Sequence, residues 1–61
     1  MYEKYEKLKN AKNLSDYQVS KEAGVARSVL SDWKNGKHTP NLDNLQKIAR
    51  YFGVSVDTLL S

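Results

Sequence analysis

Apolar and small residues between Asp16 and Trp33 recur at the spacing expected where two short helices cross. Counted from Asp16 as the first residue, the fourth, eighth, tenth, fifteenth and eighteenth positions are all apolar: Val19, Ala23, Val25, Leu30 and Trp33. The fifth residue, Ser20, is small enough to lie under a crossing helix. The ninth is Gly24, which accepts the positive φ of a tight turn. We therefore predict two helices joined by a turn at Gly24, with the apolar positions buried between them.

Capping residues and apolar periodicity predict further helices on both sides of this pair. Ser15 with Gln18 forms a capping-box pattern, whereas Ala26 is a weak N-cap for the helix that ends at Gly36. Asn41 is predicted to cap a helix whose apolar residues recur every three to four positions: Leu42, Leu45, Ile48, Ala49 and Phe52. A helix over about residues 2–12 precedes, with Tyr5 in the core, and a short one through residues 56–60 follows. We expect an all-α fold of five short helices in a single domain, residues 1–61.

The composition excludes several functions for a chain of 61 residues. It has no cysteine and one histidine, so neither a disulfide nor a zinc site is expected. No nucleophile elbow, carboxylate pair or phosphate-binding glycine loop is present, and we predict no enzyme activity, no cofactor and no small-molecule ligand. No apolar run approaches the roughly 20 residues of a membrane span, and no signal peptide is visible, which favours a cytoplasmic protein.

The positive charge is concentrated in the first part of the chain. The net charge is +3, and residues 38–61 contribute nothing to it because two basic side chains there balance two acidic ones. An excess of this kind favours a polyanionic partner without requiring one. On charge alone, a solubilising surface is the better interpretation, because the lysines of residues 4–12 interleave with Glu3 and Glu6 at helical spacing.

Three strings extend the two-helix pattern over nearly the whole chain: LSDYQVSKEAGV, RSVLSDWKNGK and TPNLDNLQKIARYFGVSVDTLL. From about Tyr5 to Leu60 the sequence resembles the helix-turn-helix domain of the phage-repressor family (Cro/CI, or Xre-like) of bacterial and phage regulators. The last string is similar to the C-terminal signature of that family, with a proline before the fourth helix. The resemblance implies a compact five-helix, lambda-repressor-like DNA-binding domain with its helix-turn-helix in helices 2 and 3.

The resemblance also implies that the helix beginning at Arg27 enters the major groove of double-stranded DNA. The residues it assigns to base edges are Arg27, Ser28, Val29, Ser31 and Asp32. Among them, Arg27 suits a bidentate contact with guanine, Val29 is expected to be exposed and to suit a thymine methyl, and Asp32 suits a cytosine amino group. The residues it assigns to phosphates are Ser15, Asp16, Tyr17, Asn35, Lys37, His38 and Thr39.

The sequence departs from the family pattern at two places. Asp16 stands where the family often has a glutamine that contacts the DNA backbone, and a carboxylate is unfavourable beside a phosphate. As an acidic residue in the first turn, Asp16 instead suits the positive end of its helix. Lys9 and Lys34 stand where the family often pairs an arginine with a glutamate. That ion pair must be absent, and one of the two lysines is expected to turn toward the DNA.

Several residues have a structural interpretation beside the functional one. Trp33 is expected in the core rather than stacked on a base, and Tyr51 is expected to be partly exposed. For Tyr17, exposed and close to the predicted DNA face, the two interpretations are equally balanced. His38 is expected to be a solvated loop residue, with a phosphate contact as the second interpretation. The leucines at 59 and 60 belong either to the core or to a patch used by a partner.

Taken together, the sequence predicts a sequence-specific transcriptional regulator of double-stranded DNA, a repressor that acts as a homodimer on a palindromic operator. The final helix and its leucines are the expected dimer contact. An antitoxin, which binds a toxin and its own promoter, is an alternative. So is a protein-interaction module whose basic face only keeps it in solution. The chain also fits the DNA-binding portion of a longer regulator.

Overall fold

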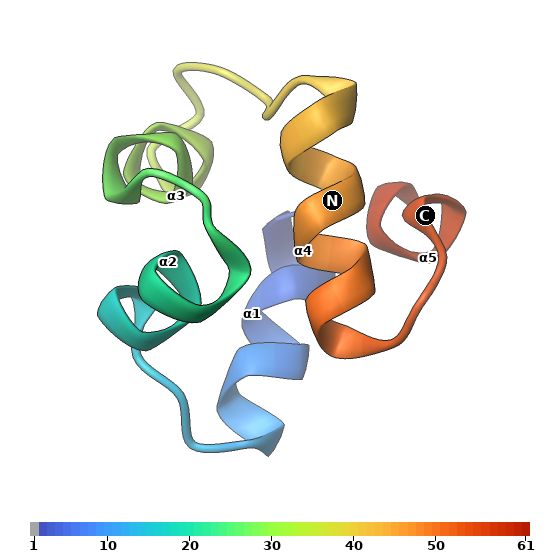
Figure 1. The fold of residues 1–61 in the computed structure, drawn as a ribbon. Helices are drawn as coiled ribbons and strands as arrows, with labels where there is room; N and C mark the ends of the chain where they lie inside the picture. Colours follow the sequence, from blue (N-terminus) through green and yellow to red (C-terminus); the bar gives the residue numbers. More distant parts are fainter. Residues whose placement is uncertain (1) are drawn as a thin grey trace.

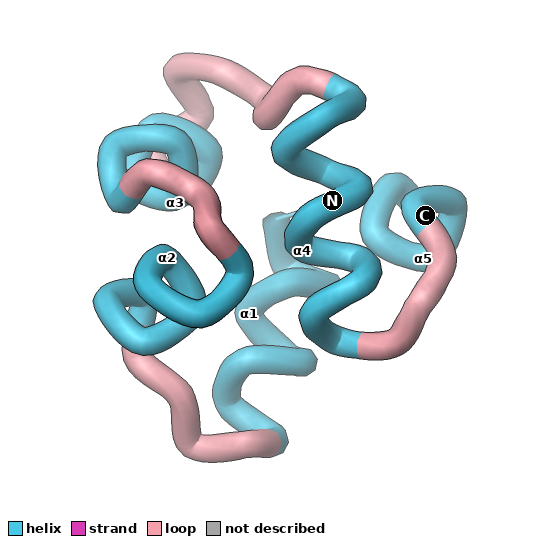
Figure 2. Tube along the Cα trace, viewed as in Figure 1, coloured by secondary structure: helices cyan, strands magenta, loops and turns pink. Residues whose placement is uncertain are grey.

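The computed structural model describes residues 2–61, which form five α-helices and no strand (Figures 1 and 2). The helices are α1 (Tyr2–Ala11), α2 (Asp16–Ala23), α3 (Arg27–Lys34), α4 (Leu42–Phe52) and α5 (Val56–Leu60). In Figure 1, α4 stands between α5 on one side and α2 with α3 on the other. It packs against both α2 and α5, while α1 packs on α5 and α2 packs on α3. The predicted all-α fold of five helices is therefore confirmed.

The helix boundaries lie at the capping residues that the sequence predicts. Ser15 and Gln18 form the full capping box: the Ser15 Oγ accepts from the Gln18 amide at 3.1 Å, and the Gln18 Oε1 accepts from the Ser15 amide at 2.9 Å. Gly24 ends α2 with a φ of +78°. The amides of Gly24 and Val25 both donate to the Ser20 carbonyl, at 3.1 and 3.2 Å. Ala26 precedes α3 without a side-chain hydrogen bond, as expected. These contacts fix the turn between α2 and α3.

The core combines the apolar residues predicted to lie between α2 and α3 with a cluster of aromatic rings. Tyr5 is fully buried and stacks on Trp33, with ring centroids 5.5 Å apart and 30° between the planes. Phe52 meets the same Tyr5 ring edge-on at 6.0 Å. The buried residues of this hydrophobic core are Tyr5, Val19, Val25, Leu30, Trp33, Leu45, Ile48, Ala49, Phe52 and Leu59. The core positions predicted for Trp33 and Tyr5 are confirmed, and Tyr51 is half-buried as expected.

Two apolar residues lie elsewhere than the sequence predicts. Leu42, expected in the core, leaves 62% of its surface exposed. It shares a helix face with Ala49, seven residues on, but it is the first residue of α4, and the buried residues of that helix begin only at Leu45. Val29, expected to be exposed, is half-buried and packs against the core. Both were misplaced because periodicity gives the face of a helix but not the limits of the surface that covers it.

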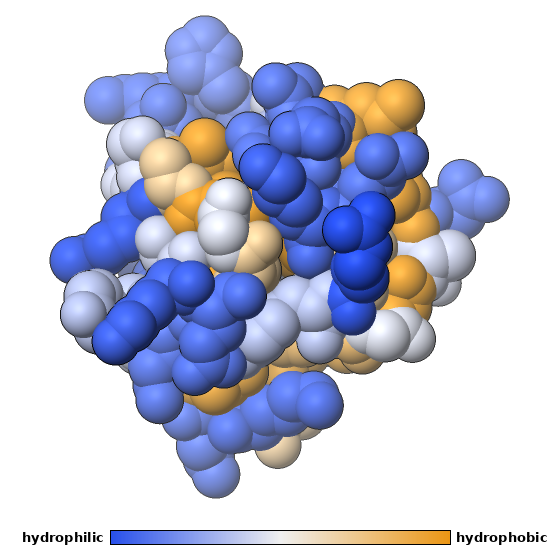
Figure 3. Space-filling model, in the orientation of Figure 1, coloured by the Kyte–Doolittle hydropathy of each residue, from blue (hydrophilic) through white to orange (hydrophobic). Residues whose placement is uncertain are grey.

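Two leucines at the end of α5 have different environments. Leu59 is fully buried, whereas Leu60 is 41% exposed. In Figure 3, apolar colour lies along the right-hand edge of the molecule, over α5 and the start of α4, and smaller apolar areas appear between α2 and α3 and at the lower edge of an otherwise polar view. This apolar edge lies away from α2 and α3 (Figure 1).

Candidate nucleic-acid interface

The start of α3 is an electropositive helix end. Its first residue is Arg27, its first turn contains no acidic residue, and Ala26 supplies no side-chain acceptor to its free amides. Unpaired amides and the helix dipole already give a helix N-terminus partial positive charge. Arg27 adds a full positive charge at the same place. This arrangement is unfavourable for an isolated helix and favourable beside an anion.

An open hollow of about 430 Å³ lies between the start of α2 and the exposed side of α3, lined by Asp16, Arg27, Ser28, Ser31, Lys34 and Asn35. Five of these residues are predicted site residues, so the structure brings together groups from both helices. The sixth, Lys34, was assigned no individual contact, although one of Lys9 and Lys34 was expected to turn toward the DNA. Its signal in the sequence was its place seven residues after Arg27, which puts both cations on one face of α3.

Four other predicted residues line a separate hollow of about 240 Å³, formed by Val29, Asp32, His38, Thr39, Pro40, Asn41 and Asn44. The two hollows share no residue, so α3 separates them. Val29 and Asp32 are both half-buried there, whereas His38 and Thr39 are exposed. The predicted base-contacting residues therefore form two groups: Arg27, Ser28 and Ser31 on one side of α3, and Val29 with Asp32 on the other.

The turn after α3 holds Lys37 by backbone contacts. Gly36 adopts a φ of +72°. The Gly36 amide donates to the Trp33 carbonyl at 3.2 Å, and the Lys37 amide donates to the Asp32 carbonyl at 2.8 Å. These two bonds make a Schellman motif, which fixes the chain where it leaves the helix. Lys37 is consequently an exposed cation with a defined backbone position at the end of α3.

The start of α2 offers two free amide donors. The capping box uses the amides of Ser15 and Gln18. Within residues 2–61, the amides of Asp16 and Tyr17 have no hydrogen-bond acceptor. Free amides at a helix N-terminus are suited to an oxyanion such as a phosphate. The phosphate contact predicted at these positions therefore has backbone donors available and does not depend on the side chains of Asp16 and Tyr17.

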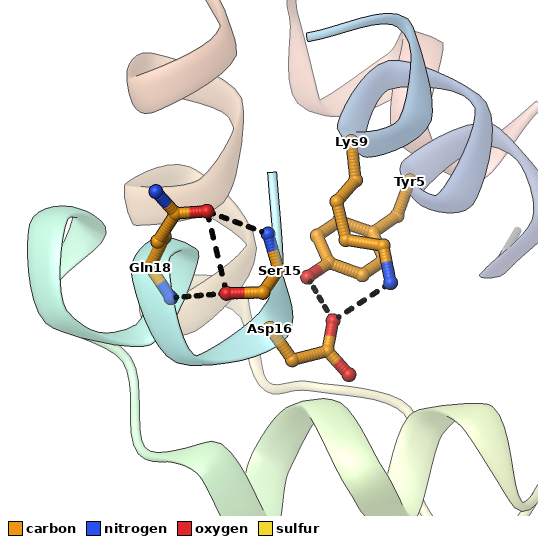
Figure 4. Close-up of polar contacts among 5 residues, drawn as sticks. All are labelled: Tyr5, Lys9, Ser15, Asp16 and Gln18. Atoms are coloured by element: carbon orange, nitrogen blue, oxygen red, sulfur yellow. Dashed lines mark hydrogen bonds and ion pairs between the residues drawn. The ribbon is translucent and has the colours of Figure 1, made fainter. Parts of the chain in front are cut away.

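The Asp16 side chain is bound to α1 (Figure 4). Its Oδ1 accepts from the Tyr5 hydroxyl at 2.7 Å and from the Lys9 Nζ at 3.1 Å. Burial alone raises the pKa of this carboxyl, but the bonds from Tyr5 and Lys9, with the charge of Lys34, lower it by more, so the pKa lies below its usual value. Burial and the bond to Asp16 raise the pKa of Tyr5.

This cluster explains both departures from the family pattern. Lys9 lacks the expected glutamate partner, and Asp16 takes that role from the start of α2, leaving only 15% of the Lys9 side chain exposed. Of the two lysines, Lys34 is therefore the one exposed beside the hollow. The Asp16 carboxylate is committed to α1 and partly neutralised there.

Tyr17 and Arg27 lie close together at the starts of α2 and α3. Tyr17 is 55% exposed, as predicted, and the Arg27 Cζ lies over its ring, 5.8 Å from the centroid. That distance is within the range of cation–π contacts. Sequence reasoning missed this pair, because the two residues are ten positions apart and meet only through the turn at Gly24.

The fold and this surface define a helix-turn-helix domain, and comparison with known proteins agrees. Residues 5–59 match the profile of the family described as "Helix-turn-helix". The chain belongs to the Cro/CI (Xre-type) helix-turn-helix family, whose members are DNA-binding transcriptional regulators. The resemblance inferred from the sequence is thus confirmed.

Two curated relatives are regulators of this type. The chain is 39% identical over 59 residues to the HTH-type transcriptional activator BcrR of Enterococcus faecalis, covering 97% of this chain and 29% of that protein. It is 34% identical over 47 residues to an uncharacterized HTH-type transcriptional regulator of Methanocaldococcus jannaschii, covering 77% of this chain and 71% of that protein. The chain thus spans less than a third of the activator's length. No significant match was found among solved structures.

Two further observations concern other kinds of site. Between Tyr2 and Ser61, no three histidine, cysteine or acidic residues are grouped so as to hold a metal ion. Over the same residues, every helix is too short or too polar to cross a lipid bilayer.

Proposed function

We propose that this chain binds specific sequences of double-stranded DNA as a transcriptional regulator, with α3 in the major groove. One observation carries the proposal. Arg27 begins α3, which has no side-chain cap, and it lies beside the free amides at the start of α2. One element suits base edges and the other suits the adjacent phosphates. The major groove is wide enough to admit a helix.

In this proposal the two sides of α3 read different bases. Arg27 donates to the O6 and N7 of a guanine, and the hydroxyls of Ser28 and Ser31 contact neighbouring bases from the same hollow. On the other side, Asp32 accepts from a cytosine amino group and the remaining exposed surface of Val29 meets a thymine methyl. Because Val29 and Asp32 are half-buried, we assign most of the base choice to the Arg27 side.

Phosphate contacts surround these base contacts. The amides of Asp16 and Tyr17 serve one phosphate, which assigns the Asp16 contact to the backbone rather than to the carboxylate. Lys34 is added to the predicted set, since it lines the same hollow as Arg27. The other proposed phosphate contacts are Ser15, Asn35, Lys37, His38 and Thr39. These contacts supply affinity and salt dependence without sequence choice.

We propose a homodimer on a palindromic operator, because a single small domain buries a modest interface. The exposed Leu60 on α5 and Leu42 at the start of α4 offer apolar surface for the second copy. Repression by occlusion of a promoter is the first candidate outcome. Activation is the second candidate outcome, because the E. faecalis relative is described as a transcriptional activator. A reporter gene placed downstream of the selected operator distinguishes the two by the sign of its response.

Selection from a random duplex library, followed by titration of the best sequence at two salt concentrations, tests the proposal. We expect a palindromic consensus with half-sites about 34 Å apart and an affinity that falls steeply with salt. Arg27→Ala is expected to cost about 1–3 kcal/mol and to relax choice at one base pair, whereas Lys37→Ala weakens all sequences alike. Unselective binding, or binding that ignores salt, would contradict the proposal and favour a protein-interaction module.

A further inference from the structure

We propose that Tyr17 is a positioning residue that sets the base specificity of Arg27 by holding its guanidinium over the Tyr17 ring. The Arg27 Cζ lies 5.8 Å from the ring centroid. The two residues lie in the first turns of adjacent helices, Tyr17 as the second residue of α2 and Arg27 as the first of α3, so the contact crosses the helix-turn-helix at its DNA-facing end. The inference rests on the proposed function, since it assumes that Arg27 reads a base.

Arg27 has little else to orient it. Within residues 2–61 its guanidinium makes no hydrogen bond or ion pair. Ala26 offers no polar side chain, and the first turn of α3 contains no carboxylate. A long, exposed side chain in this setting samples many rotamers, and ordering it on binding costs entropy. A ring that holds the guanidinium beforehand lowers that cost for the one geometry that reaches the base.

An aromatic ring suits this role because it leaves the arginine donors free. A guanidinium reads guanine through its N–H groups, and a carboxylate partner would occupy two of them. A ring attracts the cation through its face and takes up none of these donors. The carboxylate that lines the same hollow, Asp16, is bound by Tyr5 and Lys9 instead. The contacts from Tyr5 and Lys9 on α1 thereby keep the Asp16 carboxylate from forming an ion pair with Arg27.

The role of the ring is separable from a role of the hydroxyl. The Tyr17 side chain is 55% exposed, and its hydroxyl has no partner in the described part of the chain. A direct phosphate contact would use the hydroxyl and would not discriminate among bases. Tyr17→Phe removes the hydroxyl and keeps the ring, whereas Tyr17→Leu removes both. Because the hydroxyl has no partner, Tyr17→Phe is not expected to alter the thermal melt, whereas Tyr17→Leu should lower the Tm only slightly, by the loss of one exposed ring contact.

The experiment measures binding to the selected duplex and to its single-base-pair variants. At the base pair read by Arg27, we expect Tyr17→Leu to reduce discrimination about two- to five-fold, the factor that an exposed cation–π contact supplies. Tyr17→Phe should retain it. In an Arg27→Ala background, Tyr17→Leu should have no further effect on that base pair. In the free protein, the ring-current shift of the Arg27 side-chain protons should survive Tyr17→Phe and disappear in Tyr17→Leu.

The possible failures are distinguishable. If Arg27→Ala relaxes one base pair but Tyr17→Leu leaves discrimination there unchanged, the inference fails and the proposed function stands. If Tyr17→Phe and Tyr17→Leu weaken all sequences equally, the hydroxyl contacts a phosphate and the positioning role is overturned. If Arg27→Ala relaxes no base pair, the proposed orientation of α3 itself is wrong.

Discussion

Asp16→Asn is expected to destabilise the fold and to strengthen binding to DNA. The Asp16 Oδ1 accepts from both Tyr5 and Lys9, which ties the start of α2 to α1. The asparagine amide oxygen can still accept a hydrogen bond from Tyr5 or Lys9, but it carries no negative charge to attract the Lys9 ammonium. The substitution therefore removes the charged part of the cluster and leaves its shape almost unchanged.

The expected loss of stability is about 1–2 kcal/mol. Hydrogen bonds to charged groups contribute about 1.5–3 kcal/mol, and the lower figure reflects the acceptor that asparagine retains and partial screening by solvent. The Lys9 and Asp16 side chains are 15% and 27% exposed, so screening is incomplete. For a domain of this size the change lowers the Tm by roughly 4–16 °C.

The pH dependence follows from the lowered pKa of Asp16. A carboxyl whose pKa is lower in the folded state stabilises the fold above its unfolded pKa of about 3.9. That stabilisation is lost as the pH falls through the lower, folded-state pKa. The difference in unfolding free energy between wild type and Asp16→Asn should therefore reach its maximum at pH 7 and should vanish in strong acid. Urea unfolding at a series of pH values measures it.

The effect on DNA has the opposite sign. The asparagine side chain carries no negative charge beside the amides of Asp16 and Tyr17, which are proposed to bind phosphate. Lys9 also loses its ion pair and becomes free to turn toward the hollow lined by residue 16 and Arg27. We expect tighter binding to all duplexes, with a salt slope steeper by about 0.9 if Lys9 gains one phosphate. Asp57→Asn is the matched control, since it makes the same charge change on α5. Equal stability of wild type and Asp16→Asn at pH 7, or a difference that persists in strong acid, would refute the role given to the cluster.

Three substitutions test the packing and the turn by thermal and urea unfolding. Trp33→Ala should cost about 3–5 kcal/mol, because the ring is 5% exposed and stacks on Tyr5; an unchanged melt would contradict its place in the core. Gly24→Ala should cost about 1–2 kcal/mol from a φ of +78° alone, since an added Cβ meets nothing within 4 Å. A stabilised variant would contradict that backbone conformation. At concentrations where the chain is monomeric, Leu42→Ala should change stability by less than about 0.5 kcal/mol, and a larger loss would mean that the leucine is covered within the monomer.

The helices could be predicted from the sequence because their signals are local. Ser15 and Asn41 accept hydrogen bonds from amides three residues on, and Gly24 takes a left-handed φ within its own turn. Burial of Val19 and Leu30 also followed, since their spacing is that of a helix crossing. None of these features needs knowledge of a distant part of the chain.

The features that the sequence did not reveal depend on tertiary placement. Asp16 meets Tyr5 and Lys9 across eleven and seven residues, and only the packing of α1 beside α2 brings them together. The division of the predicted contacts between two hollows likewise depends on how α3 lies against α2 on one side and against residues 38–44 on the other. Leu42 and Val29 were misplaced for the same reason, because their burial depends on where neighbouring elements end.

Backbone amide shifts, followed by NMR while the selected duplex is added, would show directly whether α3 enters the DNA. We expect the largest changes at Asp16 and Tyr17, at the start of α3 from Arg27, and in the turn at Lys37. Binding that leaves the amides of α3 unmoved while those of other helices shift would contradict a recognition role for α3.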